Sequence, residues 1–105
     1  AAIPHTWRHV PKKSSKTVGA QIDLLFDRDD DAITICEIKY TAKPFLIDKE
    51  YAEKIRKKIE VFQNVTGTKK QIFFAMISAN GIKKNKYSEL LLSGIVTLDD
   101  LFGES

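Results

Sequence analysis

The order of apolar and polar positions divides the chain into short predicted elements, and the first of these form a hairpin. Residues 20–26 and 32–40 are rich in Ile, Leu, Phe and Thr, and the acidic segment 27–31 between them consists of turn-forming residues. Two such strands around such a segment predict a β-hairpin. With Asp30 at the centre of the turn, residues whose numbers sum to 60 lie opposite one another.

Later segments predict a helix and a buried strand. Pro44 ends the second hairpin strand because proline has no N–H to donate. Asp48 is placed as the N-cap of a helix that runs to about residue 65 and that Gly67 closes, with apolar residues at helical spacing within it. The apolar run 71–78 is typical of a central strand buried on both faces.

Together these elements predict an α/β fold with a mixed sheet. The hairpin strands are antiparallel, whereas a β-α-β crossover joins the second of them to the strand at 71–78, so that these two should be parallel. The remaining expected elements are a strand near 6–10, a short helix or hairpin arm at 88–92, a short strand at 94–97 and a capping turn at 99–102.

Three polar residues of the hairpin, Asp23, Glu37 and Lys39, form the main candidate site. Side chains alternate faces along a strand, so Glu37 and Lys39 share a face at a spacing of about 6.6 Å, and Ile38 points the other way. The hairpin register places Asp23 opposite Glu37, where like charges destabilise strand pairing. Mg²⁺ or Mn²⁺ suits such oxygen ligands and keeps coordination positions for a substrate phosphate. Lys39 would then help to orient or deprotonate the attacking water.

The same residues lie in sequence strings that resemble a known family. Asp23, followed after thirteen intervening residues by the string Glu37-Ile38-Lys39, resembles the active-site hairpin of the PD-(D/E)xK nuclease superfamily. Three longer strings are similar to the C-terminal nuclease-like domain of archaeal and bacterial AAA-type ATPases, namely residues 19–25, 36–40 and 97–102. The resemblance covers nearly the whole chain.

This resemblance implies a fold and a set of roles. The fold would be a truncated restriction-endonuclease-like core. Asp23, Glu37 and the backbone carbonyl of Ile38 would hold the metal, and Lys39 would assist catalysis. The chain, residues 1–105, would be a single nuclease-like domain and a C-terminal fragment of a longer ATPase, whose ATPase domain is its expected partner.

Two departures from the family pattern accompany the resemblance. Nucleases of this superfamily usually place a helix with a further acidic residue before the hairpin, and residues 1–18 contain neither Asp nor Glu. The RecB-like subgroup carries a Gln four residues before a Tyr on the helix after the lysine, whereas Ile47 stands four residues before Tyr51 here. Part of the family's site is therefore expected to be missing.

Basic residues are clustered on a chain of net charge +3 and a pI of about 9.0. Such clusters follow a phosphate backbone if the fold brings them to one side. Candidates for DNA contacts are Lys12, Lys13, Lys16, Lys83, Lys84 and Lys86, with plain solubility as the alternative for the last three. The basic cluster at 54–58 is interpreted as a solvated helix face, because Glu50 with Lys54 and Glu53 with Lys57 are spaced for i, i+4 ion pairs.

Other chemistries fit the sequence poorly. The single cysteine, Cys36, permits no internal disulfide and favours a reducing, cytoplasmic setting, and no apolar run approaches the length of a membrane span. Residues 27–31 resemble the start of a calcium loop, but Ala32 replaces its glycine. His5 and His9 lack the Cys or acidic neighbours of a zinc site.

Two functions remain open from the sequence. The first is a Mg²⁺-dependent endonuclease domain that hydrolyses phosphodiester bonds, with double-stranded DNA as the expected substrate. The alternative is a nuclease-fold module without chemistry, which binds DNA, forms a homodimer or regulates an attached ATPase. A third reading makes Lys39 the structural salt-bridge partner of Glu37 or Asp23.

Overall fold

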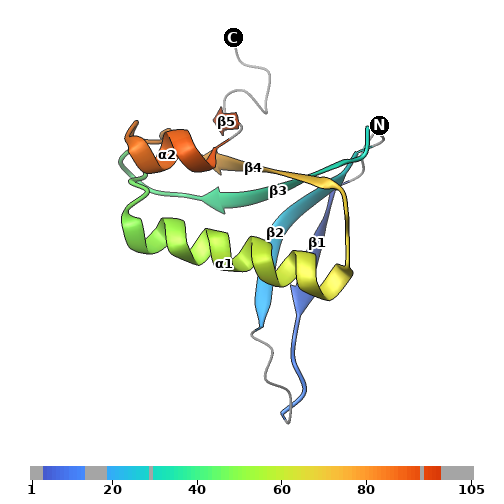
Figure 1. The fold of residues 1–105 in the computed structure, drawn as a ribbon. Helices are drawn as coiled ribbons and strands as arrows, with labels where there is room; N and C mark the ends of the chain where they lie inside the picture. Colours follow the sequence, from blue (N-terminus) through green and yellow to red (C-terminus); the bar gives the residue numbers. More distant parts are fainter. Residues whose placement is uncertain (1–3, 14–18, 29, 93, 98–105) are drawn as a thin grey trace.

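The structure, a computed structural model, describes residues 4–13, 19–28, 30–92 and 94–97, which form a small α/β domain with a mixed sheet and two helices (Figure 1). Its elements in chain order are β1 (Pro4–His9), β2 (Ala20–Asp27), β3 (Ala32–Lys39), α1 (Lys49–Thr66), β4 (Gln71–Ser78), α2 (Lys86–Leu91) and β5 (Gly94–Thr97). The strand order is β1-β2-β3-β4-β5; β1, β2 and β3 pair antiparallel, and the pairs β3–β4 and β4–β5 are parallel. The predicted mixed sheet, hairpin and β-α-β crossover are confirmed.

The hairpin register agrees with the prediction from the sequence. Leu24 lies opposite Cys36, and the pairing continues to Asp27 opposite Ile33, so each pair of numbers sums to 60. Asp31 adopts a positive φ of 62° in the turn, a conformation that Asp tolerates better than most residues. The acidic turn therefore sets the register that brings Asp23 and Glu37 to the same level.

The β1–β2 pairing contains an irregularity that the sequence did not indicate. His5 lies opposite Leu25, but Trp7 lies opposite Ile22, so β2 carries one extra residue between these two pairs. Ile22 and Leu25, three positions apart, are both buried. A shift of this kind changes the direction of the side chains beside it, and Asp23 lies within the shifted segment.

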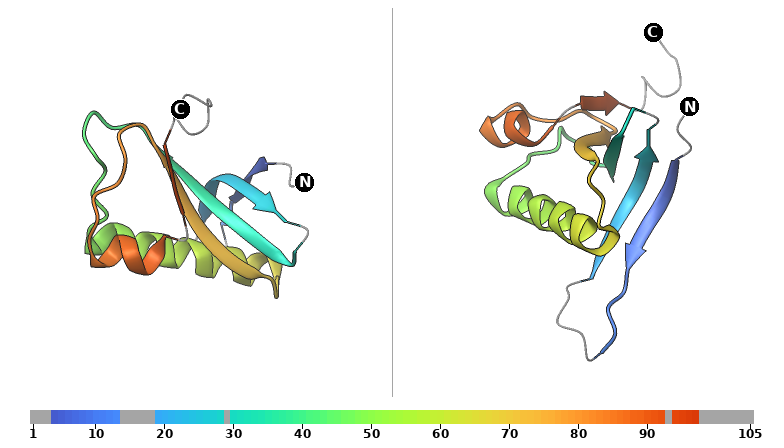
Figure 2. Two further views of the ribbon diagram at one scale, coloured as in Figure 1. Left: turned by 90° about the horizontal axis from the view of Figure 1, so that it is seen from above. Right: turned by 45° about the vertical axis from the view of Figure 1, so that its right-hand side comes forward.

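Helix α1 covers one face of the sheet, with α2 beside it (Figure 2). The caps are the predicted ones: the Asp48 side chain accepts a hydrogen bond from the Tyr51 N–H at 2.8 Å, and Gly67 takes the left-handed conformation at φ 67°. The apolar stripe of α1 contributes Ile55 and Phe62 to the buried core, and this burial stabilises the packing of the helix on the sheet. The core consists of Ile22, Leu25, Ile33, Ile35, Ile47, Ile55, Phe62, Phe74 and Met76.

The segment after β4 forms a helix, which resolves the choice between helix and hairpin arm. Asn85 caps α2 by accepting a hydrogen bond from the Ser88 N–H, and Ser88 returns the contact to the Asn85 N–H. The Asn85 amide also donates to the carbonyl of Ile47 at 2.9 Å, which ties α2 to the start of α1. The first strand begins two residues earlier than expected, at Pro4, and the expected turn at 99–102 lies outside the described residues.

Neither helix in the described ranges combines the length and the apolar character that crossing a membrane requires.

Candidate functional site

Asp23 and Glu37 meet where the regular pairing of β2 and β3 ends. The Asp23 N–H donates to Glu37 Oε2 at 3.3 Å, and the Ile38 N–H donates to Asp23 Oδ2 at 2.9 Å. Each carboxylate therefore takes a backbone donor of the opposite strand in place of a ladder hydrogen bond. This reciprocal contact, called the carboxylate clasp below, brings together the two acidic residues singled out in the sequence.

The cation that contacts the clasp comes from α1. Lys58 Nζ lies 2.6 Å from Glu37 Oε1, and the two side chains are 18% and 6% exposed, respectively. An opposite charge at this distance compensates much of the cost of burying the Glu37 carboxylate. The prediction that Lys58 belongs to a solvated helix face is thus wrong.

The position of Lys58 on the helix explains why it faces the sheet. It follows Ile55 by three residues and precedes Phe62 by four, and both of these residues are buried in the core. Residues at these spacings lie on one side of a helix. The sequence therefore indicated only that Lys58 lies at the edge of the apolar stripe. Its partner Glu37 is distant in the sequence, so helical spacing does not reveal the ion pair.

The exposed face of α1 also pairs differently from the expectation. Glu53 contacts Arg56 at 2.9 Å, and Lys57 contacts Glu60 at 2.9 Å, both as i, i+3 pairs. Among the described residues these contacts replace the predicted pairs of Glu50 with Lys54 and of Glu53 with Lys57. Arg56 accounts for the altered pairing of Glu53, because its side chain contacts Glu53 and also reaches Glu60.

Lys39 points toward two aromatic rings near the clasp. Its Nζ lies 5.2 Å from the ring centroid of Tyr51 and 5.6 Å from that of Phe45, distances that allow cation–π attraction. The two rings pack edge to face at 5.0 Å. Lys39 thus takes a position set by aromatic residues, and Glu37 takes Lys58 as its ion-pair partner instead of Lys39.

The Tyr51 hydroxyl lacks a hydrogen-bond partner within the described part of the chain, although its oxygen is buried. Burial raises the pKa of this phenol, and the nearby charges of Glu37 and Asp23 raise it further. Tyr51 is linked to the strand that carries Glu37 through the contact of its ring with Lys39 Nζ. A buried donor without a partner is costly and is often explained by a bound group or water.

Cys36 lies next to Glu37 in β3 and is 3% exposed. Burial raises the pKa of its thiol to about 11, and the charges of Glu37 and Asp23 act in the same direction. A thiol with a raised pKa stays protonated at neutral pH and is a poor nucleophile. This environment agrees with the interpretation of Cys36 as a small buried residue.

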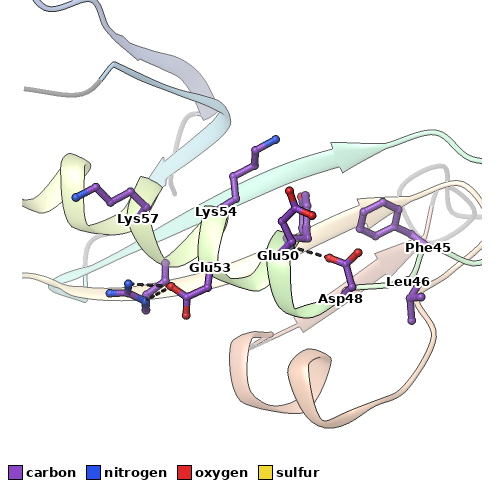
Figure 3. Close-up of a pocket in the computed structure, with 9 residues that line it drawn as sticks. Phe45, Leu46, Asp48, Glu50, Glu53, Lys54 and Lys57 are labelled. Carbon is purple, nitrogen blue, oxygen red and sulfur yellow. Dashed lines mark hydrogen bonds and ion pairs between the residues drawn. The ribbon is translucent and has the colours of Figure 1, made fainter.

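Within the described residues, hollows border α1 on two sides of Lys54 and Lys57. The first, of about 670 Å³, is lined by Phe45, Leu46, Asp48, Glu50, Tyr51, Glu53, Lys54, Arg56 and Lys57 (Figure 3). The second, of about 380 Å³, is called the lysine hollow below and is lined by Gly19, Ala20, Gln21, Lys54, Lys57, Lys58 and Val61. Lys54 and Lys57 line both hollows, and Figure 3 shows them extending from α1 away from Glu53. The lysine hollow adjoins the clasp through Lys58.

The lysines predicted to contact DNA lie in two separate parts of the fold. Lys12 and Lys13 are exposed and follow the end of β1. Lys83 and Lys84 are exposed just before α2, Lys86 is its exposed first residue, and Lys16 lies outside the described residues. Their role in DNA binding stays a prediction, and the lysine hollow adds basic residues that the sequence pattern alone assigns to a solvated helix face.

The described residues contain no group of three or more His, Cys, Asp or Glu arranged to hold a metal ion. The clasp offers two carboxylates and the neighbouring carbonyl of Ile38. These are hard oxygen donors of the kind that Mg²⁺ and Mn²⁺ prefer, and two carboxylates are a common protein contribution to such a site.

Comparison with known proteins gave no match to a family model, to a curated protein or to a solved structure.

Proposed function

We infer that this chain is a metal-dependent nuclease-like domain of the PD-(D/E)xK type, with a restriction-endonuclease-like core, that hydrolyses phosphodiester bonds of DNA. The carboxylate clasp is the observation that carries the proposal. Asp23 and Glu37 come from different strands and meet where pairing ends. Their Lys39 neighbour projects from the same strand as Glu37.

Two features of the site agree with a bound cation. Lys58 already places a positive charge on Glu37 Oε1 at 2.6 Å, so its ammonium group acts as a stand-in for an ion at this carboxylate. The Tyr51 hydroxyl is a buried polar atom that a bound water or substrate oxygen would satisfy. The donor types present therefore fit Mg²⁺ or Mn²⁺, which Asp23, Glu37 and the Ile38 carbonyl would hold.

A bound divalent ion would supply Lewis acidity and lower the pKa of a water molecule. The residues of the chain would provide the remaining electrostatics. Lys39, two residues after Glu37 in β3, would stabilise the negative charge that develops on the phosphate. Lys54 and Lys57 in the lysine hollow would bind neighbouring phosphates of the same strand and fix its position.

A second candidate function is favoured by one specific contact. The Glu37 oxygens already accept from Lys58 Nζ and from the Asp23 N–H, which is the arrangement expected of a site that has lost its metal. The chain would then be a nuclease-fold module that binds DNA or regulates an attached ATPase domain without chemistry.

Cleavage of supercoiled plasmid DNA in Mg²⁺ or Mn²⁺ separates the two functions. We expect nicking or linearisation by the wild-type chain, and at least a roughly hundredfold slower reaction for Glu37→Ala and for Lys39→Ala. Glu50→Ala is the matched control, because it removes an exposed glutamate of α1, and it should cleave at the wild-type rate. Salt-dependent DNA binding without cleavage, unchanged by divalent ions, would support the non-catalytic module instead.

A further inference from the structure

Lys58 and a divalent cation held by Asp23 and Glu37 would bind the same carboxylate group of Glu37. We propose that Lys58 is a built-in competitor at the metal site: it neutralises Glu37 in the metal-free protein and leaves it when a divalent cation binds. This inference rests on the metal site of the proposed function, and it adds a regulatory residue that neither the sequence strings nor the family resemblance assigned.

The geometry of the pair carries the first step. Lys58 Nζ lies 2.6 Å from Glu37 Oε1, and Glu37 Oε2 is held by the Asp23 N–H at 3.3 Å. A metal ion bound to both Asp23 and Glu37 would approach the same carboxylate that the ammonium group occupies. Two cations do not share one carboxylate oxygen at contact distance without strong repulsion, so binding of one weakens binding of the other.

The surroundings of Lys58 allow it to leave. Its side chain lines the lysine hollow together with Gln21, Lys54 and Lys57, and it keeps 18% of its surface exposed. A long, flexible side chain at the edge of a helix stripe can turn its ammonium group toward water while its methylene groups stay in place. Release from Glu37 therefore does not require the helix to move.

The charge of the free protein also favours this role. Glu37 is nearly fully buried, and burying a carboxylate without a partner is costly. In the absence of metal, Lys58 supplies the positive charge that offsets this cost. The ion pair thus keeps the Glu37 carboxylate in place as a metal ligand, and it lowers the affinity of the site for the metal ion.

Direct measurement of Mn²⁺ binding by isothermal titration calorimetry tests the proposal on the whole 105-residue chain. Lys58→Gln removes the competing charge, and we expect Mn²⁺ to bind at least tenfold more tightly than to wild type. Arg56→Gln is the control, because it removes a positive charge from the exposed face of the same helix, where Arg56 pairs with Glu53. Its affinity should stay within twofold of wild type.

Lys58→Arg keeps the competing charge and should bind Mn²⁺ no more tightly than wild type. This second variant keeps the test decisive if Lys58→Gln folds poorly. The proposal that Lys58 competes with the metal would be overturned if wild type and Lys58→Gln bound Mn²⁺ with equal affinity. It would also be overturned if Lys58→Gln bound Mn²⁺ more weakly with an unchanged circular dichroism spectrum. Tighter binding in Lys58→Gln without any DNA cleavage would support competition and refute only the nuclease proposal. Absence of Mn²⁺ binding in every variant would overturn both.

Discussion

Removing the Lys58 charge should destabilise the folded protein far more than removing any exposed lysine of α1. At a separation of 2.6 Å, and with an effective dielectric constant of about 20, two unit charges attract by about 6 kcal/mol before desolvation is counted. Breaking a buried pair by removing one partner typically costs about 3–5 kcal/mol. Since the Lys58 side chain keeps 18% exposure, we expect about 3 kcal/mol for Lys58→Met.

A double-mutant cycle in urea, at pH 7 and without divalent ions, isolates the pair. Glu37→Gln keeps an oxygen acceptor for the Asp23 N–H while removing the charge, and we expect it to cost about 1 kcal/mol. The variant with both changes should be less destabilised than the sum of the two single variants by about 2 kcal/mol or more. Met and Lys have similar helix propensities, so the cycle reports the ion pair and not the helix.

Lys57→Met is the control for this cycle. Its contact with Glu60 joins side chains that are 51% and 45% exposed, and such surface pairs contribute about 0–1 kcal/mol. If Lys58→Met and Lys57→Met lose the same free energy of unfolding within about 0.5 kcal/mol, the Lys58–Glu37 contact does not stabilise the fold and the reasoning is refuted.

Three further outcomes follow from the site and its surroundings. Tyr51→Phe removes a buried hydroxyl that has no partner among the described residues. The free energy of unfolding of the metal-free variant in urea should therefore equal that of wild type or exceed it by up to about 1 kcal/mol. A decrease of more than about 1 kcal/mol would show that the hydroxyl is hydrogen-bonded. The pKa of Cys36 is raised to about 11 from 9.0, so the neutral thiol contributes stability that is complete below pH 9 and is lost as the pH approaches 11. The difference in unfolding free energy between wild type and Cys36→Ala should therefore shrink by about 2–3 kcal/mol between pH 8 and pH 11, and a constant difference would contradict the raised pKa. Gly67→Ala should cost about 1 kcal/mol in thermal or urea unfolding because the helix cap has a φ of 67°, and an unchanged stability would mean that the cap relaxes.

Local sequence rules were sufficient for the hairpin and for the ends of α1. The turn residues around Asp30 and the period of two along each strand set the register, and that register is enough to place Asp23 and Glu37 at the same level. Asp48 and Gly67 marked the helix ends because their chemistry suits the two caps. These features depend on residues close together in the sequence.

The features that the sequence did not reveal depend on contacts between distant segments. Lys58 meets Glu37 across 21 positions, and helical spacing alone could not separate the edge of the apolar stripe from the solvated face. The extra residue of β2 near Asp23 arises from pairing with β1, where no glycine or proline marks it. The position of Lys39 likewise depends on the rings of Phe45 and Tyr51, which only the folded chain brings together.

The most direct test of the central claim is a crystal of this chain grown with Mn²⁺ and measured at a wavelength where manganese scatters anomalously. The expected result is one anomalous peak in contact with carboxylate oxygens of both Asp23 and Glu37, with Lys58 Nζ moved away from Glu37. A map without a peak between these carboxylates, at Mn²⁺ concentrations that saturate other Mg²⁺-type sites, and with Lys58 still paired to Glu37, would contradict a metal site in this domain.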